Sequence, residues 1–335
     1  IEPWQNGVLG QMVQKQEYAL DRQEVRQYFT YNSARDGILK LTEDLFGVDI
    51  RPWKTTTWDP SVEAYELVDQ GKVIGRFYFD SHPRPGKYSH ANMVPLRNGI
   101  KGRTVPVAAL VMNLPKGDHA TGLMEHGDVV TFLHEFGHMI HGMFSASDRW
   151  AGVSGITTEW DFVEAPSQML EEWVYDYDTL KGFAVNAKGE TIPRELVEKM
   201  NRARYFDMGL GDMRQLALAN ISLRLHQGPP PADLGAETRR LDREYNMVPM
   251  AGFAQLQSSF GHLTGYSAIY YTYRWSKVIS SDLFTQFQQN GLRDRATADR
   301  YRRLVLEPGG SKPAAQMVQD FLGRPVSLDA YRAEM

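Results

Sequence analysis

The segment His134-Glu135-Phe136-Gly137-His138 places two histidines four residues apart, with a glutamate directly after the first. On an α-helix, residues four apart lie about 40° apart around the axis, so two such imidazoles can hold one metal ion. The neighbouring sequence predicts this helix over 129–145, with Asp128 as N-cap and these apolar residues at helical spacing: Val129, Phe132, Leu133, Phe136, Ile140 and Met143. A metal-binding helix is therefore the first hypothesis.

A histidine pair on an apolar helix can also be two core histidines, so the metal hypothesis needs a third ligand. A histidine six residues past His138 would define one class of metallopeptidase, but that position is Phe144. The alternative is a carboxylate from a second helix. Spacing does not choose among five candidates, which are Glu159, Asp161, Glu164, Glu171 and Glu172.

Three segments carry a resemblance to a known family: HEFGHMIHGMF, DFVEAPSQMLEEW and FGHLTGYSAIYYTYRWS. Together they resemble the thimet oligopeptidase–neurolysin family of zinc peptidases. The segments RPGKYSHA and EPGGS extend the resemblance over nearly the whole chain. It implies that Glu164 is the third ligand beside His134 and His138, with one Zn²⁺ per chain. Family members are about twice as long, so the chain is similar to their catalytic half only.

The resemblance also assigns roles around the metal. Glu135 is the expected general base, which takes a proton from water and passes it to the leaving amine. His262, Tyr266 and Tyr273 are expected to contact substrate and oxyanion, and Tyr270 to bind substrate. Without the resemblance, these tyrosines would be packing residues on one stripe of a predicted helix over 265–290.

Some nearby groups have two interpretations each. His141 is either a partner of the ligands or a core histidine. A carboxylate is expected on the free ring nitrogen of one ligand histidine. Glu171 is the first candidate for that position, with Asp161 and Glu172 as alternatives, and an exposed helix carboxylate is the other interpretation of each. Lys87, in the loop predicted over 83–102, is expected to be structural.

The bulk composition excludes several classes of protein. A net charge of −4 argues against a nucleic-acid partner, and no apolar run approaches the ~20 residues of a membrane span. The absence of cysteine excludes disulfides and thiolate chemistry. It fits a cytoplasmic location, with a periplasmic or secreted one as alternative. The start at Ile1 indicates a processed or truncated end, and a homo-oligomer remains open.

The expected fold is mainly α with a small β-sheet, of the gluzincin type among zincins. Strands are predicted over 64–68, 73–80 and 107–112, the first two as a hairpin. We expect one catalytic region over 1–335: 1–125 holds the sheet, and 126–335 is helical and holds the site. A further helix is predicted over 162–180. Strand 73–80 or 107–112 is expected to pair with substrate as a sheet edge.

The predicted function is zinc-dependent hydrolysis of short oligopeptides by an oligoendopeptidase. A dipeptidyl carboxypeptidase of the same family is the first alternative. The second is a non-catalytic peptide-binding fragment that lacks an N-terminal half.

Overall fold

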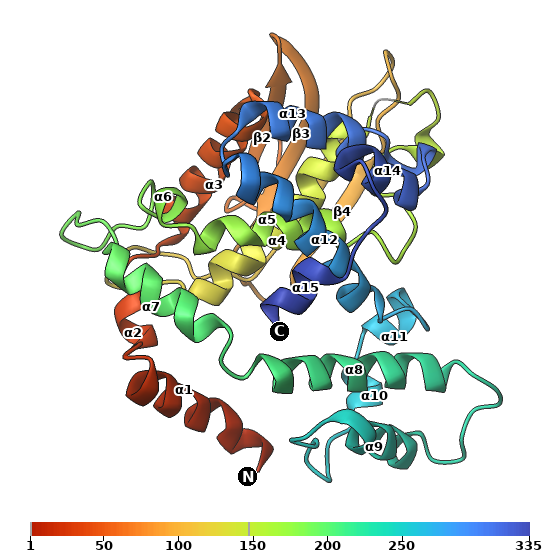
Figure 1. Ribbon diagram of the computed structural model, residues 1–335. Coiled ribbons are helices and arrows are strands. Elements are labelled where there is room, and N and C mark those ends of the chain that lie inside the picture. The colour runs from red at the N-terminus through yellow and green to blue at the C-terminus, as the bar shows by residue number, and fades with distance from the viewer. Residues whose placement is uncertain (1, 147) are drawn as a thin grey trace.

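The computed structural model describes residues 2–146 and 148–335. It confirms a mainly helical fold with one small sheet (Figure 1). The strands are β1 (Asp49–Pro52), β2 (Glu63–Asp69), β3 (Lys72–Asp80), β4 (Asn92–Arg97) and β5 (Val107–Val111). The helices are α1 (Asn6–Glu17), α2 (Arg22–Arg26), α3 (Tyr31–Phe46), α4 (His126–Phe144), α5 (Ala165–Leu170), α6 (Tyr177–Leu180), α7 (Arg194–Arg204), α8 (Met208–Leu225), α9 (Leu234–Tyr245), α10 (Leu256–Ser259), α11 (His262–Gly265), α12 (Thr272–Asn290), α13 (Arg295–Tyr301), α14 (Ala314–Leu322) and α15 (Asp329–Glu334).

The sheet has the strand order β1-β2-β3-β5-β4, with a parallel β3–β5 pair and antiparallel neighbours elsewhere. The β2–β3 hairpin is confirmed. Its turn residues Gln70 and Gly71 both have positive φ, which suits the twist of a two-residue hairpin. The prediction that strand 73–80 or 107–112 pairs with substrate is wrong, because β3 and β5 are both interior.

The exposed edge next to α4 is β4, in a segment that the sequence predicted as loop. Pro95 sits within this strand, and most of its other side chains are polar or exposed. Proline cannot donate to a neighbouring strand and is tolerated at a sheet edge. The proline and the polar or exposed side chains are the reason that the sequence of β4 did not show the pattern by which a strand is predicted.

Lys87 fixes the loop that leads into β4. Its buried ammonium donates to the carbonyls of Asp80 and His82 at 2.7 Å each, and also to the carbonyl of Met112. It also pairs with the Asp80 carboxylate at 3.0 Å. Because these groups lie at the ends of β3 and β5, Lys87 ties the loop to the sheet, in agreement with the structural role expected for it.

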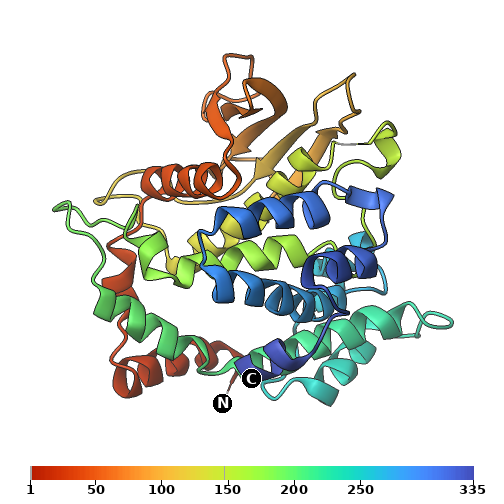
Figure 2. The ribbon, with the colours of Figure 1, turned by 45° about the horizontal axis from the view of Figure 1, so that its top comes forward.

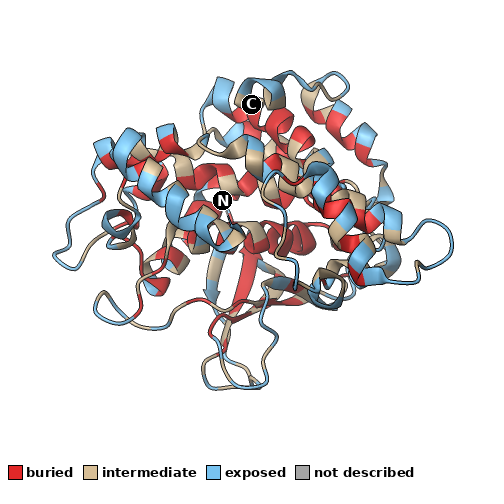
Figure 3. Cartoon of the chain, turned by 90° about the horizontal axis from the view of Figure 1, so that it is seen from below, coloured by how far each residue is buried: buried red, intermediate tan, exposed pale blue. Residues whose placement is uncertain are grey.

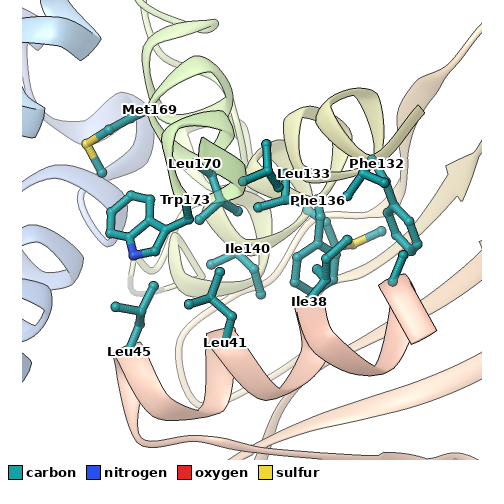
Figure 4. Close-up of a cluster of buried hydrophobic side chains, with 14 of the residues drawn as sticks. Ile38, Leu41, Leu45, Phe132, Leu133, Phe136, Ile140, Met169, Leu170 and Trp173 are labelled. Atoms are coloured by element: carbon teal, nitrogen blue, oxygen red, sulfur yellow. The ribbon is translucent and has the colours of Figure 1, made fainter. Parts of the chain in front are cut away.

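Helix α4 lies at the centre of the fold, between the sheet and α5. The Phe132 and Phe136 rings pack edge-on against Phe79 of β3 at 5.5 and 5.8 Å. Figure 4 shows the other side of this core, where α3 contributes Ile38 and Leu41 beneath the helix. A helix buried around most of its surface positions its polar side chains rigidly.

The start of α4 differs from the prediction. The helix begins at His126, and Glu125 occupies the N-cap position. The Asp128 carboxylate reaches back to the Glu125 amide at 2.8 Å, so Asp128 belongs to the first turn and forms part of a capping box.

The predicted helix over 162–180 is three short pieces. Glu164 occupies the N-cap position of α5, and Pro166 lies in its first turn. The chain continues as a 3-10 turn over Glu171–Tyr175 and then as α6. Proline is favoured at a helix start because the first amides have no intrahelical acceptor. Glu164 is thus held at a helix start rather than within a helix.

The predicted helix over 265–290 is also interrupted. Ser267 has a φ of 49°, a conformation that a right-handed helix cannot contain, and α12 begins only at Thr272. The single helical stripe predicted for Tyr266, Tyr270 and Tyr273 is therefore wrong. The residues meet through a folded turn instead.

Helices α1, α7, α8 and α9 form a lower layer, separated from the sheet by the central helices (Figure 2). In Figure 3, buried residues gather on the central helices and exposed residues on the outer ones. Phe260 and Tyr270 pack with Leu218 of α8 in a small apolar cluster, which ties the lower layer to the tyrosine-rich turn. The division at 125/126 stays a prediction.

Gly137 permits the close crossing of α4 and α5. A Cβ atom there would lie 2.6 Å from the backbone Cα of Ser167, which is closer than packed atoms can approach.

We expect Gly137→Ala to push α5 away, to destabilise the fold by about 1–3 kcal/mol, and to weaken metal binding. Metal titration and thermal unfolding would measure both effects. Gly127→Ala on the same helix, where the added Cβ meets nothing within 4 Å, is the matched control. Equal behaviour of the two variants would contradict the prediction.

Candidate metal centre and active site

The structure brings His134, His138 and Glu164 together. Their donor atoms lie within 4.8 Å of one another. The Nε2 atoms of both histidines are each 3.1 Å from Oε2 of Glu164. Helix α4 supplies the histidines from one face, and the close crossing at Gly137 brings the N-cap position of α5 against that face. Two imidazoles and one carboxylate on one side match the donor set of a three-ligand catalytic metal site.

The electrostatics of this cluster are strongly coupled. Burial would lower the pKa of His134, but hydrogen bonds to Glu164 and Glu171 raise it well above the usual value. Burial would likewise raise the pKa of Glu164, but His138 and His134 hold it well below its usual range. The carboxylate is thus ionised and directed at the histidines. A divalent cation held by these donor atoms would take the place of their direct contacts.

The five carboxylates of the 158–173 segment now have distinct partners. Glu171 accepts from Nδ1 of His134 at 2.6 Å, the position expected of a carboxylate behind a ligand. Glu172 instead binds Arg204 and Lys277, so it is not the partner of a ligand histidine. The other two have different partners: the Tyr271 hydroxyl donates to Asp161, and the Ala314 amide donates to Glu159.

We expect Glu171→Gln to weaken metal affinity about 10–100-fold, because an amide orients the imidazole less firmly and makes it less basic. The dissociation constant can be measured by competition with a chromophoric chelator. Glu159→Gln, on the same segment but not directed at the cluster, is the control. An unchanged dissociation constant in Glu171→Gln would remove Glu171 from the site.

Glu135 lies about 100° around α4 from His134, beside the metal cluster. It is buried, and burial raises its pKa while the charges of His134 and His138 lower it. The backbone of Met93 on β4 lies near enough to contribute to lowering the pKa of Glu135. Glu135 therefore sits between the histidine pair and the exposed sheet edge.

The tyrosine-rich turn reaches the cluster at Glu164. The Tyr266 hydroxyl donates to Oε1 of Glu164 at 2.5 Å, and the Tyr273 ring lies 5.4 Å from the Tyr266 ring. Burial and the Glu164 charge raise the pKa of both phenols, so both remain protonated donors. The His262 ring lies 5.4 Å from the Tyr266 ring and 5.7 Å from the Tyr273 ring.

Tyr270 also belongs to this turn. Its ring is 4.9 Å from that of Tyr273, but Gln215 of α8 is near enough to its hydroxyl to lower the pKa of Tyr270, against the larger effect of burial, which raises it. The ring is buried in the small cluster with Phe260 and Leu218. The geometry thus gives Tyr270 a packing contact, and its role in substrate binding stays a prediction.

Two residues near the site were not singled out as site residues from the sequence. The exposed Trp160 packs its ring edge-on against Tyr266 at 5.2 Å. His90, on the loop before β4, lies near enough to His262 for its charge to contribute to lowering the pKa of His262, after burial. The Asn113 amide donates to the carbonyls of Tyr88 and His90 and holds that loop. His90 lies in the segment RPGKYSHA that carries part of the resemblance, whereas Trp160 has no motif or spacing signal in the sequence.

A buried HExxH helix on a small mixed sheet, with a glutamate from a second segment, defines a zincin-type metallopeptidase fold. The chain belongs to peptidase family M3, whose model matches residues 1–335. This agrees with the resemblance to thimet oligopeptidases.

Three similarities place the chain within that family and fold. It is 34% identical to organellar oligopeptidase A, chloroplastic/mitochondrial, of Arabidopsis thaliana, over 97% of this chain and 44% of that protein. It is 29% identical to a dipeptidyl carboxypeptidase of Salmonella typhimurium (strain LT2), over 98% of this chain and 50% of that protein. The solved structure described as "The Structure of CHT" shares the fold, with a TM-score of 0.58 and 11% identity, over 98% of this chain and 64% of that one. The chain thus spans about half the length of the curated relatives it matches.

Proposed function

We propose that the chain is a zinc-dependent metallopeptidase that hydrolyses peptide bonds in short oligopeptides. The observation that carries this proposal is the convergence of His134, His138 and Glu164, with Glu135 beside the histidines and the Tyr266 hydroxyl bound to Glu164. This arrangement places a base and hydrogen-bond donors around one metal position. A peptide carbonyl at that position would have both within reach.

His134, His138 and Glu164 would hold one Zn²⁺ per chain. When bound, Zn²⁺ polarises the scissile carbonyl and lowers the pKa of water at its open position toward ~7. Glu135 accepts a proton from the attacking water and delivers it to the leaving amine. Tyr266, Tyr273 and His262 donate hydrogen bonds to the oxyanion that develops on the carbonyl, where each such donor is typically worth about 3 kcal/mol.

Strand β4 offers a place for the substrate backbone. It is the sheet edge next to α4, and the backbone of Met93 lies near Glu135. An extended peptide can add to such an edge through backbone hydrogen bonds. This strand takes the role that we first expected of strand 73–80 or 107–112.

The proposal includes a class of substrate and a cellular location. Oligopeptides are the proposed partners, with a cytoplasmic location and a periplasmic or secreted one as alternative. None of the helices within 2–146 and 148–335 is long and apolar enough to cross a membrane. A homo-oligomer stays a prediction.

The test is zinc content by elemental analysis, with cleavage of a quenched fluorescent oligopeptide panel by the same 335-residue sample. One zinc per chain with chelator-sensitive cleavage is the expected result. Zinc without cleavage would favour the peptide-binding alternative. Absence of zinc binding would overturn the proposal.

The dipeptidyl carboxypeptidase alternative has a specific reason, because a protein described as one is 29% identical over 98% of this chain. That activity depends on the free carboxylate of the substrate. Paired peptides with free and amidated C-termini separate the two activities. Cleavage of both at internal bonds supports the oligoendopeptidase.

A further inference from the structure

His141 is a fully buried histidine on the ligand face of α4. At 100° per residue, His134, His138 and His141 fall within one narrow stripe of the helix, so His141 lies next to the metal ligands along the axis. It has no exposed surface. Neither of its ring nitrogens hydrogen bonds to any group in the described part of the chain.

The two ligand histidines differ in whether their Nδ1 atom has a hydrogen-bond partner. Nδ1 of His134 is held by Glu171 at 2.6 Å, whereas Nδ1 of His138 is buried and has no partner among residues 2–146 and 148–335. Ligand histidines almost always donate their second ring N–H to a carboxylate, a carbonyl or a water, which fixes the tautomer and the ring orientation. His138 needs such a partner to present Nε2 to the metal.

Packing alone does not explain a histidine at position 141. The ring has no exposed surface, and a neutral imidazole has one donor and one acceptor to satisfy. An unsatisfied buried polar group typically costs about 1–3 kcal/mol, which a leucine of similar volume would avoid. No neighbouring group in the described part of the chain relieves this cost, and the Ser145 hydroxyl one turn further on donates to the Gly142 carbonyl instead.

We propose that His141 is a positioning residue, joined to Nδ1 of His138 through a buried water. The Nδ1–H group of His138 donates to the water, and the water donates to the acceptor nitrogen of His141. Buried waters commonly satisfy such pairs of polar groups. His141 thereby does for the second ligand what Glu171 does for the first. The inference rests on the proposed metal site, which it deepens.

The test compares zinc affinity with apo stability in the full 335-residue chain. His141→Leu keeps the volume but removes both nitrogens, and we expect it to weaken zinc binding about 10–100-fold. Its apo melting temperature should be unchanged or higher, because an unpaired polar group has been removed. His141→Gln retains a donor and an acceptor and should restore much of the affinity. Met139→Leu, buried on the opposite side of α4, is the control.

The possible results separate this inference from the proposed function. If the wild-type chain binds zinc and His141→Leu binds it equally well, only the role of His141 is overturned. The role is also overturned if both His141 variants lose affinity in parallel with apo stability, because that identifies a core residue. A wild-type chain that binds no zinc overturns both proposals. A crystal structure with water density between His138 and His141 would support the proposed link directly.

Discussion

Replacing Glu135 with glutamine is expected to lower kcat about 10³-fold while one zinc per chain is retained. The amide has the same shape as the carboxylate but cannot take a proton from water. Because Glu135 does not belong to the cluster formed by His134, His138 and Glu164, the metal ligands stay in place. Steady-state cleavage of a fluorescent oligopeptide, with elemental analysis of the same sample, measures both quantities.

Glu198→Gln is the matched control, since it makes the same chemical change on an exposed position of α7. It should leave kcat and zinc content unchanged. Retention of more than about a tenth of wild-type kcat in Glu135→Gln would contradict the role of general base, because such a group supplies at least ~10²-fold. Loss of zinc in Glu135→Gln would instead show that Glu135 contributes to metal binding.

The metal cluster could be predicted because its key spacing is local. His134 and His138 are related by one helical turn, and an apolar helix around them follows from the sequence alone. The third ligand is different, since the path of the chain between α4 and α5 decides which carboxylate reaches the histidines. The sequence left five candidates, and only the resemblance chose Glu164.

The missed features depend on long-range structure. The edge position of β4 follows from the order in which strands pair, and no local pattern around Pro95 encodes that order. The break at Ser267 arises where the chain folds back over the cluster, against the helical pattern of its neighbours. The partner of His134 is a different case, because Glu171 was the first candidate and holds that position, whereas the adjacent Glu172 binds Arg204 and Lys277.

Glu172→Gln is expected to cause the largest loss of stability. The Glu172 carboxylate is buried, accepts from both terminal nitrogens of Arg204 at 2.6 and 2.8 Å, and pairs with Lys277 at 2.7 Å. It joins the 3-10 turn Glu171–Tyr175 to α7 and α12. Removing its charge leaves the partly buried Arg204 without a carboxylate partner in the described part of the chain and leaves Lys277 only the longer pair with Glu334 at 3.6 Å, so we expect a loss of about 3 kcal/mol in the free energy of unfolding. Urea unfolding at neutral pH measures this loss.

The pH dependence gives an independent check on the same group. Burial would raise the pKa of Glu172, but Lys277 and Arg204 overcome that effect and lower it from 4.5 to about 2. A carboxyl with a depressed folded-state pKa stabilises the fold above its unfolded pKa, and this contribution is lost as the pH falls toward 2. The wild-type free energy of unfolding should therefore decline more steeply than that of Glu172→Gln between pH 4.5 and 2. Glu195→Gln, which removes an exposed partner of Lys199, should follow the wild-type curve. Parallel curves for the wild type and Glu172→Gln would show that this buried pairing does not control acid stability.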